Sequence, residues 1–111
     1  MLTYICGNTA TETWQEDFEK AEDWLKRNAM KPINSGKLVS ALPPLTYEQY
    51  TYLNYRLIEM SKCVFMIDGW QDSKTANAEL QYAKTLGKTI KYQDYYKEFR
   101  KKEKPNVEQT F

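Results

Sequence analysis

The sequence predicts an α/β domain built on a small parallel sheet with helices on both faces. Short apolar runs alternate along the chain with amphipathic stretches, and the run Cys63–Ile67 is apolar throughout. A strand without polar alternation is typical of a sheet that is covered on both faces. Strands that alternate with helices are typical of parallel pairing, because each helix carries the chain back to the start of the next strand.

The first predicted elements are a strand and an amphipathic helix. Leu2–Cys6 is apolar and is followed by Gly7-Asn8, which favours a strand that stops at a loop. Thr13 and Glu16 have the spacing of a capping box. Apolar residues then recur at helical spacing, so we expect a helix over Thr13–Ala29 with its charged side facing water.

The next segment predicts a weak strand, a loop and a second helix. Met30–Asn34 is short, and a proline at its centre restricts it to the edge of a sheet. Ser35–Leu45 contains glycine and two prolines and is expected to be a loop. Thr46 and Gln49 form a second capping box, and the helix is expected to run to about Ser61. One side of this helix is lined by Tyr50, Leu53, Leu57 and Met60.

The last part of the chain repeats the alternation. After the apolar run we expect a helix over Ser73–Leu86, a short strand over Thr89–Tyr92 and a helix over Asp94–Lys104. The segment 105–111 is expected to be a flexible tail. The sequence therefore predicts a single domain over residues 1–104.

Composition excludes several function classes. The 111 residues suit one domain, and sixteen basic against fifteen acidic residues give a net charge of +1, which offers no argument for binding nucleic acid or a membrane. The chain has no histidine, which removes the commonest metal ligand and every histidine-based catalytic arrangement. Cys6 and Cys63 are interpreted as reduced core thiols of a cytoplasmic protein. We expect no metal and no cofactor.

Glu79 occupies an unusual position on the third predicted helix. At about 100° per residue, this glutamate lies inside the apolar arc formed by Ala76, Leu80 and Ala83. An inward-facing carboxylate would lie near the crevice where parallel α/β folds bind ligands. The alternative is a glutamate on a solvated flank of the helix. Burial would raise the pKa of this carboxyl, whereas the helix N-terminus would lower it.

The loop that precedes this helix also carries candidate binding residues. Asp68, Gly69 and Trp70 follow the third predicted strand, and Asp72 and Ser73 begin the helix. Free backbone N–H groups at the start of a helix favour an anion. Ser73 is therefore a candidate to bind a phosphate or a sugar. An ordinary helix cap at Asp72 or Ser73 is the alternative. Trp70 could stack on a nucleobase or pack against a neighbouring helix.

Taken together, these segments resemble the nucleoside 2-deoxyribosyltransferase superfamily, and in particular its small phage and bacterial branch. The resemblance covers about residues 2–92. It implies a flavodoxin-like three-layer sandwich with a small, mostly parallel sheet of four or five strands. It also implies cleavage of the N-glycosidic bond of a 2′-deoxynucleoside or its 5′-monophosphate, with the deoxyribosyl group passing to water (hydrolysis) or to a second base (transfer). The residues that carry it are Tyr4-Ile5-Cys6-Gly7, the run from Cys63 to Ser73, Glu79, Ala83 and Gly87.

The resemblance also implies roles for individual residues. Glu79 is the nucleophile that attacks C1′ of the sugar, and Tyr4 contacts it. Such chemistry parallels that of retaining glycosidases, in which a carboxylate forms a covalent intermediate. The leaving base needs a proton, for which Asp68 and Asp72 are both candidates. The implied substrate-binding residues are Cys6, Gly7, Asn8, Gly69, Trp70 and Ser73.

Two other functions remain open at this point. One is a non-catalytic protein, such as a small phage-encoded one, that binds or sequesters a nucleotide-derived signal. The other is an interaction module that uses Tyr95-Tyr96 and the basic segment Arg100-Lys101-Lys102, for which a solvated charged helix is the simpler interpretation. The resemblance further implies a homodimer or a larger homo-oligomer.

Overall fold

A computed structural model describes residues 1–96, which form a four-stranded sheet and the helices around it. All strand pairs are parallel, and the strand order is β2-β1-β3-β4. The predicted fold class is confirmed as a parallel α/β sandwich of the flavodoxin-like kind. The strands are β1 (Leu2–Cys6), β2 (Lys31–Ile33), β3 (Cys63–Met66) and β4 (Thr89–Tyr92). The α-helices are α1 (Trp14–Arg27), α2 (Ser35–Val39), α3 (Tyr47–Met60) and α4 (Lys74–Thr85), with short 3-10 turns η1 (Trp70–Asp72) and η2 (Gln93–Tyr95).

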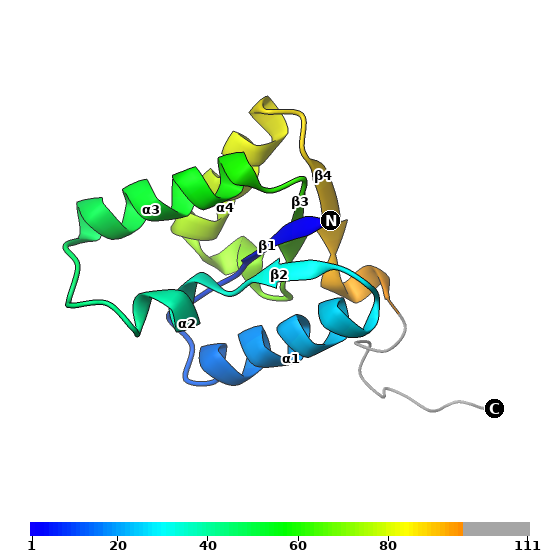
Figure 1. Ribbon diagram of the computed structural model, residues 1–111, viewed down its shortest axis with the longest axis horizontal. Helices are drawn as coiled ribbons and strands as arrows, with labels where there is room; N and C mark the ends of the chain where they lie inside the picture. The colour runs from blue at the N-terminus through cyan, green and yellow to red at the C-terminus, as the bar shows by residue number, and fades with distance from the viewer. Residues whose placement is uncertain (97–111) are drawn as a thin grey trace.

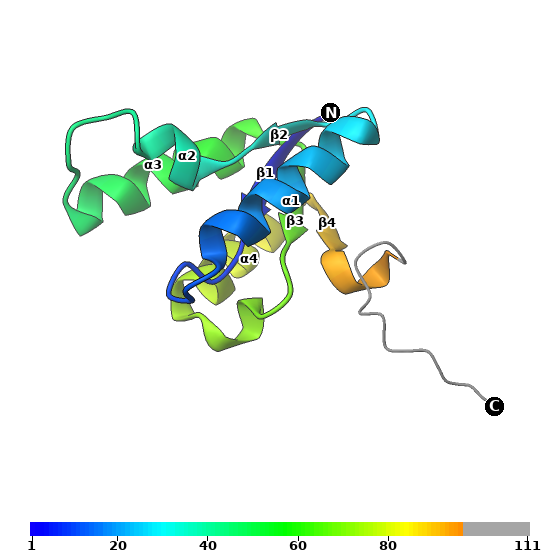
Figure 2. The same cartoon turned by 90° about the horizontal axis from the view of Figure 1, so that it is seen from below.

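The helices form two layers on opposite faces of the sheet. Helix α1 covers one face, and α3 and α4 cover the other (Figures 1 and 2). Because successive side chains of a strand point to opposite faces, Tyr4 and Cys6 pack towards α3 and α4. Ile5, which lies between them, packs with Phe18 of α1. The two faces therefore have separate hydrophobic cores.

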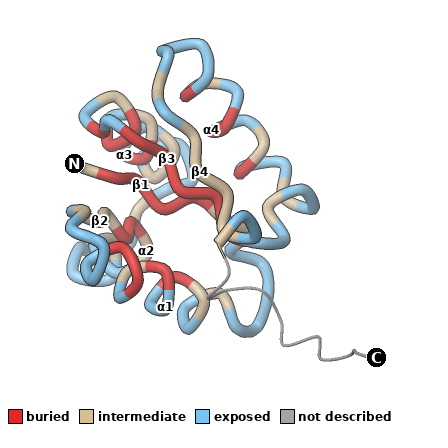
Figure 3. The backbone as a smooth tube through the Cα atoms, turned by 90° about the vertical axis from the view of Figure 1, so that its right-hand side faces the viewer, coloured by how far each residue is buried: buried red, intermediate tan, exposed pale blue. Residues whose placement is uncertain are grey.

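Burial is greatest in the two central strands. Figure 3 shows buried residues along β1 and β3 and exposed residues on the outer sides of the helices. Strand β2 pairs only with β1, which confirms its predicted place at an edge of the sheet. The chain places β2 on one side of β1 and then crosses over to place β3 and β4 on the other side of β1. In such sheets the crevice for a ligand opens at the carboxyl ends of the two strands where the order reverses, here β1 and β3.

The segment Ser35–Leu45, predicted as a loop, contains the short helix α2, so this prediction is wrong in part. The Asn34 side chain caps it by accepting a hydrogen bond from the backbone N–H of Lys37 at 3.2 Å. The Nδ2 of Asn34 also donates to Glu22 of α1 at 3.2 Å. Because contacts with α1 help to fix this single turn, helical periodicity within the segment could not reveal it.

The two predicted capping boxes have different outcomes. Thr46 and Gln49 form the reciprocal pair of bonds that defines the motif, which confirms the prediction. Thr13 makes no cap bond, because its backbone (φ −103°, ψ 9°) is not extended as a cap requires. Its hydroxyl donates instead to a carboxylate oxygen of Asp17 at 3.0 Å.

The C-terminal predictions are only partly covered by the structure. The start of the expected helix over Asp94–Lys104 is a single 3-10 turn, η2. The remainder of that helix, the segment Arg100–Lys102, the domain boundary at residue 104 and the tail 105–111 lie outside the described residues. Within residues 1–96, no helix is both long and apolar enough to cross a membrane.

Candidate functional site

The carboxyl group of Glu79 lies in the interior, between α4, α3 and β1. Glu79 is only 4% exposed. The Tyr4 hydroxyl donates a hydrogen bond to Oε1 at 3.0 Å, and the Cys6 thiol donates to the same oxygen at 3.4 Å. The Nδ2 of Asn54 donates to Oε2 at 3.3 Å. The inward-facing interpretation is therefore confirmed, and the solvated flank is excluded.

Local sequence explains why these groups meet. The Ser73 hydroxyl caps α4 by accepting from the N–H of Ala76 at 3.0 Å, which sets the first turn of the helix. Ala76, Glu79 and Leu80 then face the sheet. On β1, Tyr4 and Cys6 are two residues apart, so both point to this same face.

Burial and hydrogen bonding act on the Glu79 carboxyl in opposite directions. Burial raises its pKa, and the bonds from Tyr4, Cys6 and Asn54 lower it; burial dominates, so the pKa is raised above its ordinary value. Burial, followed by the charge of Glu79, raises the pKa of Tyr4 and of Cys6 well above their ordinary values. Both groups therefore remain protonated donors to the carboxylate at neutral pH.

A small cavity adjoins Glu79 at the carboxyl end of β1. Its volume of about 20 Å³ is enough for about one water molecule. Thr9 and Thr75 are exposed at its rim. A larger ligand requires the side chains at this rim to move apart. The residues that line the cavity are Tyr4, Ile5, Gly7, Thr9, Phe18, Ser35, Tyr50, Asn54, Thr75 and Glu79.

The predicted residues at the end of β1 and just after it have different environments. Cys6 contacts the Glu79 carboxyl directly, and Gly7 lines the cavity. Asn8 does not line it. Its side-chain oxygen accepts from the N–H of Ala10 at 2.9 Å, which closes the turn after the strand. The structure therefore brings two of these three residues to Glu79.

Ser73 and Trp70 make structural contacts. Ser73 is the helix cap described above, as the simpler interpretation predicted. The Trp70 ring packs against Tyr92 of β4 with a centroid distance of 5.9 Å and borders the core on the α4 side. Its ring thus packs against the protein itself, and neither Ser73 nor Trp70 lines the cavity beside Glu79.

The remaining predicted residues lie on the surface turn between β3 and α4. Asp68 and Asp72 are exposed, and Gly69 adopts φ +92°, a left-handed conformation that favours glycine. The backbone N–H of Asp68 donates to the Gln93 side chain at 2.8 Å. This turn follows the carboxyl end of β3, but none of the three residues lines the Glu79 cavity.

Sequence reasoning did not identify Asn54 and Ser35, both of which line the cavity. Asn54 is 2% exposed and lies on the buried side of α3 with Leu57 and Ile58. Its spacing of three and four residues from that pair was a usable signal. Ser35 is also 2% exposed, and its side chain lowers the pKa of Tyr4 through a hydrogen bond. Met60, which we expected on the inner side, is 63% exposed.

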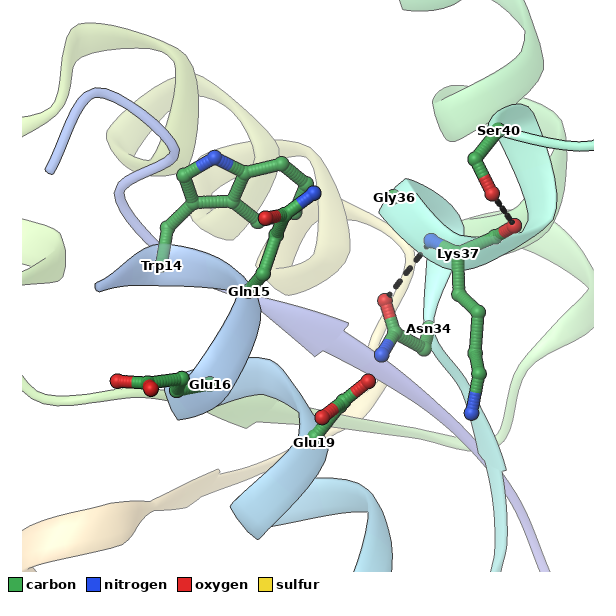
Figure 4. Close-up of a pocket in the computed structure, with 8 residues that line it drawn as sticks. All are labelled: Trp14, Gln15, Glu16, Glu19, Asn34, Gly36, Lys37 and Ser40. Carbon is green, nitrogen blue, oxygen red and sulfur yellow. Dashed lines mark hydrogen bonds between the residues drawn. The ribbon is translucent and has the colours of Figure 1, made fainter. Parts of the chain in front are cut away.

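A larger hollow of about 360 Å³ lies between α1 and α2 (Figure 4). Its walls are polar and charged, with Glu16 and Glu19 on the α1 side and Lys37 on the α2 side (Figure 4). Trp14 closes one end, and its indole ring lies against the backbone of Gly36. None of the predicted site residues lines this hollow. Within residues 1–96, no cluster of three or more potential metal ligands is present.

Comparison with known proteins places the chain in a family. A domain of unknown function, DUF4406, matches residues 1–92. Comparisons with curated proteins and with solved structures gave no match. The matched range contains all four strands, among them β1 with Tyr4, and the helices α3 and α4 that carry Asn54 and Glu79. Because the match covers most of its length, the chain belongs to the DUF4406 family.

Proposed function

We propose that the protein cleaves the N-glycosidic bond of a 2′-deoxynucleoside or its 5′-monophosphate, with Glu79 as the nucleophile. The observation that carries this proposal is a buried carboxylate held by three donors at the crevice of a parallel sheet. The motif resemblance to nucleoside 2-deoxyribosyltransferases supports it. Burial of a carboxylate with a perturbed pKa beside a cavity is also typical of catalytic groups.

The reaction has two steps. A Glu79 oxygen attacks C1′, and the bond between C1′ and the base nitrogen breaks, so that its electron pair leaves with the base. The base then gains a proton. Water or a second base next attacks C1′, loses a proton and releases the sugar from the carboxylate. In both steps the negative carboxylate stabilises the positive charge that develops on the sugar.

The neighbours of Glu79 orient the carboxylate rather than react. Tyr4 and Cys6 bind one oxygen and Asn54 binds the other, so the plane of the carboxylate is fixed from both sides. The nucleophile must be ionised. Because burial raises the pKa of Glu79, the rate of base release is expected to rise with pH until this group is fully deprotonated.

Asp68 and Asp72 are the proposed sources of the proton for the leaving base. Both are exposed on the turn at the carboxyl end of β3, which is the side where a base bound in the crevice would lie. Substitution of each by asparagine distinguishes them. The donor is the aspartate whose replacement abolishes the release of adenine from its deoxynucleoside but still allows the release of a base that is a better leaving group.

The direct test is to incubate the protein with the four 2′-deoxynucleosides and their 5′-monophosphates and to quantify free base by chromatography. We expect release by the wild type and a loss of about a thousandfold or more in Glu79→Gln, on the scale of removing an essential group. Glu19→Gln is the matched control, because it neutralises an exposed carboxylate on α1. Equal release by wild type and Glu79→Gln would exclude Glu79 as the nucleophile.

A nucleotide-binding protein without turnover is the second candidate. The 4% exposure of Glu79 and the one-water cavity favour it, because turnover requires a Glu79 oxygen to reach C1′, whereas binding elsewhere in the crevice does not. Calorimetric titration with the same compounds separates the two functions. Micromolar binding without release of base would support the second candidate.

We also propose a cytoplasmic homodimer or larger homo-oligomer. The resemblance supports the assembly, and the two buried free thiols Cys6 and Cys63 suit a reducing compartment. Sedimentation velocity over a hundredfold range of protein concentration tests the assembly. A single monomeric species throughout would contradict it.

A further inference from the structure

The two ends of the Asn54 amide have different environments. Nδ2 donates to Oε2 of Glu79 at 3.3 Å. Oδ1 is buried and has no hydrogen-bond partner, and it is the only such side-chain atom in residues 1–96. Asn54 is 2% exposed and lines the cavity beside Glu79. An unpaired acceptor therefore lies next to the proposed nucleophile.

Buried polar atoms in folded proteins nearly always have a partner. A carbonyl oxygen only accepts hydrogen bonds, so the partner that suits Oδ1 must carry an O–H or N–H group. Because Asn54 is 2% exposed and lines the adjoining cavity, this cavity is the space from which such a group can approach. In the proposed reaction the sugar, rather than the base, lies next to Glu79, because Glu79 attacks C1′ of the sugar.

We propose that Oδ1 of Asn54 accepts a hydrogen bond from a hydroxyl group of the substrate's sugar. One amide then orients the nucleophile through Nδ2 and the sugar through Oδ1, which places both partners of the first step side by side. The sugar identity rests on the proposed function. The expected consequence is selection for substrates that have a free sugar hydroxyl at the 3′ or the 5′ position.

The substrate provides the first perturbation. A 2′,3′-dideoxynucleoside removes the 3′-hydroxyl, and a 2′,5′-dideoxynucleoside removes the 5′-hydroxyl. Loss of the hydroxyl that pairs with Oδ1 leaves a buried acceptor unsatisfied, so we expect the kcat/KM of the wild type to fall about tenfold or more for one of the two analogues. The analogue that is affected identifies the hydroxyl.

The protein provides the second perturbation. Asn54→Leu removes both the acceptor and the donor at similar volume, and the ratio of kcat/KM between substrate and analogue is expected to fall to about one. Asn54→Asp keeps an acceptor but adds a negative charge beside Glu79. It is expected to retain the ratio, while its pH profile for base release moves to higher pH. A role limited to packing would leave the ratio unchanged in Asn54→Leu, whereas the charge added in Asn54→Asp moves the profile in either case.

Binding of C-nucleosides provides a measurement that needs no turnover. In these compounds a carbon–carbon bond replaces the glycosidic bond, and calorimetry compares the 2′-deoxy compound with its 3′- and 5′-deoxy forms. An affinity that depends on one hydroxyl in the wild type but not in Asn54→Leu supports the inference, even if no base is ever released. Base release with an unchanged ratio in Asn54→Leu would overturn the inference and leave the proposed function intact. Equal affinities for all forms would show that water alone pairs with Oδ1.

Discussion

The Glu79→Gln variant tests whether burial dominates the energetics of the site. Glutamine has nearly the same shape but no charge. Its carbonyl oxygen can accept from the Tyr4 hydroxyl, and its amide can donate to Oδ1 of Asn54 after the Asn54 amide turns over. The number of hydrogen bonds is therefore nearly conserved. The variant differs from the wild type mainly in the ionisation of residue 79.

The expected effect on stability depends on pH. Because the pKa of Glu79 is raised in the folded state, the folded protein binds this proton more tightly than the unfolded chain does. The stabilisation is fully present below the unfolded-state pKa and is lost as the pH rises through the folded-state pKa. Each unit of difference corresponds to about 1.4 kcal/mol. Since Glu79 is only 4% exposed, solvent screening does not reduce this figure substantially.

We therefore expect Glu79→Gln and the wild type to have similar stability at pH 4 and the variant to be more stable at pH 7. Urea denaturation followed by tryptophan fluorescence from pH 4 to pH 8 measures this difference. For a domain of about 100 residues, each kcal/mol also raises the Tm by about 4–8 °C. Glu19→Gln, on the exposed side of α1, should follow the wild type within about 0.5 kcal/mol at every pH.

The opposite trend would refute this reasoning. If the wild type gained stability relative to Glu79→Gln as the pH rose from about 4 to about 5, and the difference then stayed constant, the hydrogen bonds from Tyr4, Cys6 and Asn54 would outweigh burial. The pKa of Glu79 would then be lowered in the folded state. The proposed rise of base release with pH would be lost with it.

Three further predictions concern individual side chains. Tyr4→Phe removes a donor to the Glu79 carboxylate, so the pH profile of base release should move to higher pH; an unchanged profile would contradict the role of that bond. Gly36→Ala should destabilise the fold by about 1–3 kcal/mol in urea denaturation, because a Cβ there would lie 2.6 Å from Cη2 of Trp14; an unchanged midpoint would show that the ring moves aside freely. Cys6 should react with iodoacetamide far more slowly in the native protein than in urea, because it is buried and its pKa is raised; equal rates would show an open site.

The sheet and the inward position of Glu79 were predictable because both follow from periodicity. An unbroken apolar run indicated the central strand β3, and a proline indicated the edge strand β2. Glu79 was recognisable as a charged residue inside an apolar helical arc. Each of these signals lies within one element, so the sequence alone was sufficient to detect it.

The features that were missed depend on contacts between elements. Helix α2 is fixed by Asn34, whose side chain also binds Glu22 of α1. The buried side of α3 is set by the way it packs on β1, which turns Asn54 inward and leaves Met60 exposed. Hydrophobicity alone ranked Met60 above Asn54 as an inner residue. A polar side chain lies at position 54 because that position faces the side of the sheet that carries Tyr4. This contact is visible only in the folded structure.

The cavity beside Glu79 is a better candidate for a functional site than the larger hollow between α1 and α2, and the reason is chemical. In the hollow between α1 and α2, the buried amide of Asn34 is satisfied by Lys37 and Glu22. Beside Glu79, by contrast, a buried carboxylate and an unpaired Asn54 oxygen both oppose folding. An apolar side chain at either position would pack without these penalties. Two buried polar groups thus break local rules of folding side by side, which is typical of a site that is shaped for a ligand.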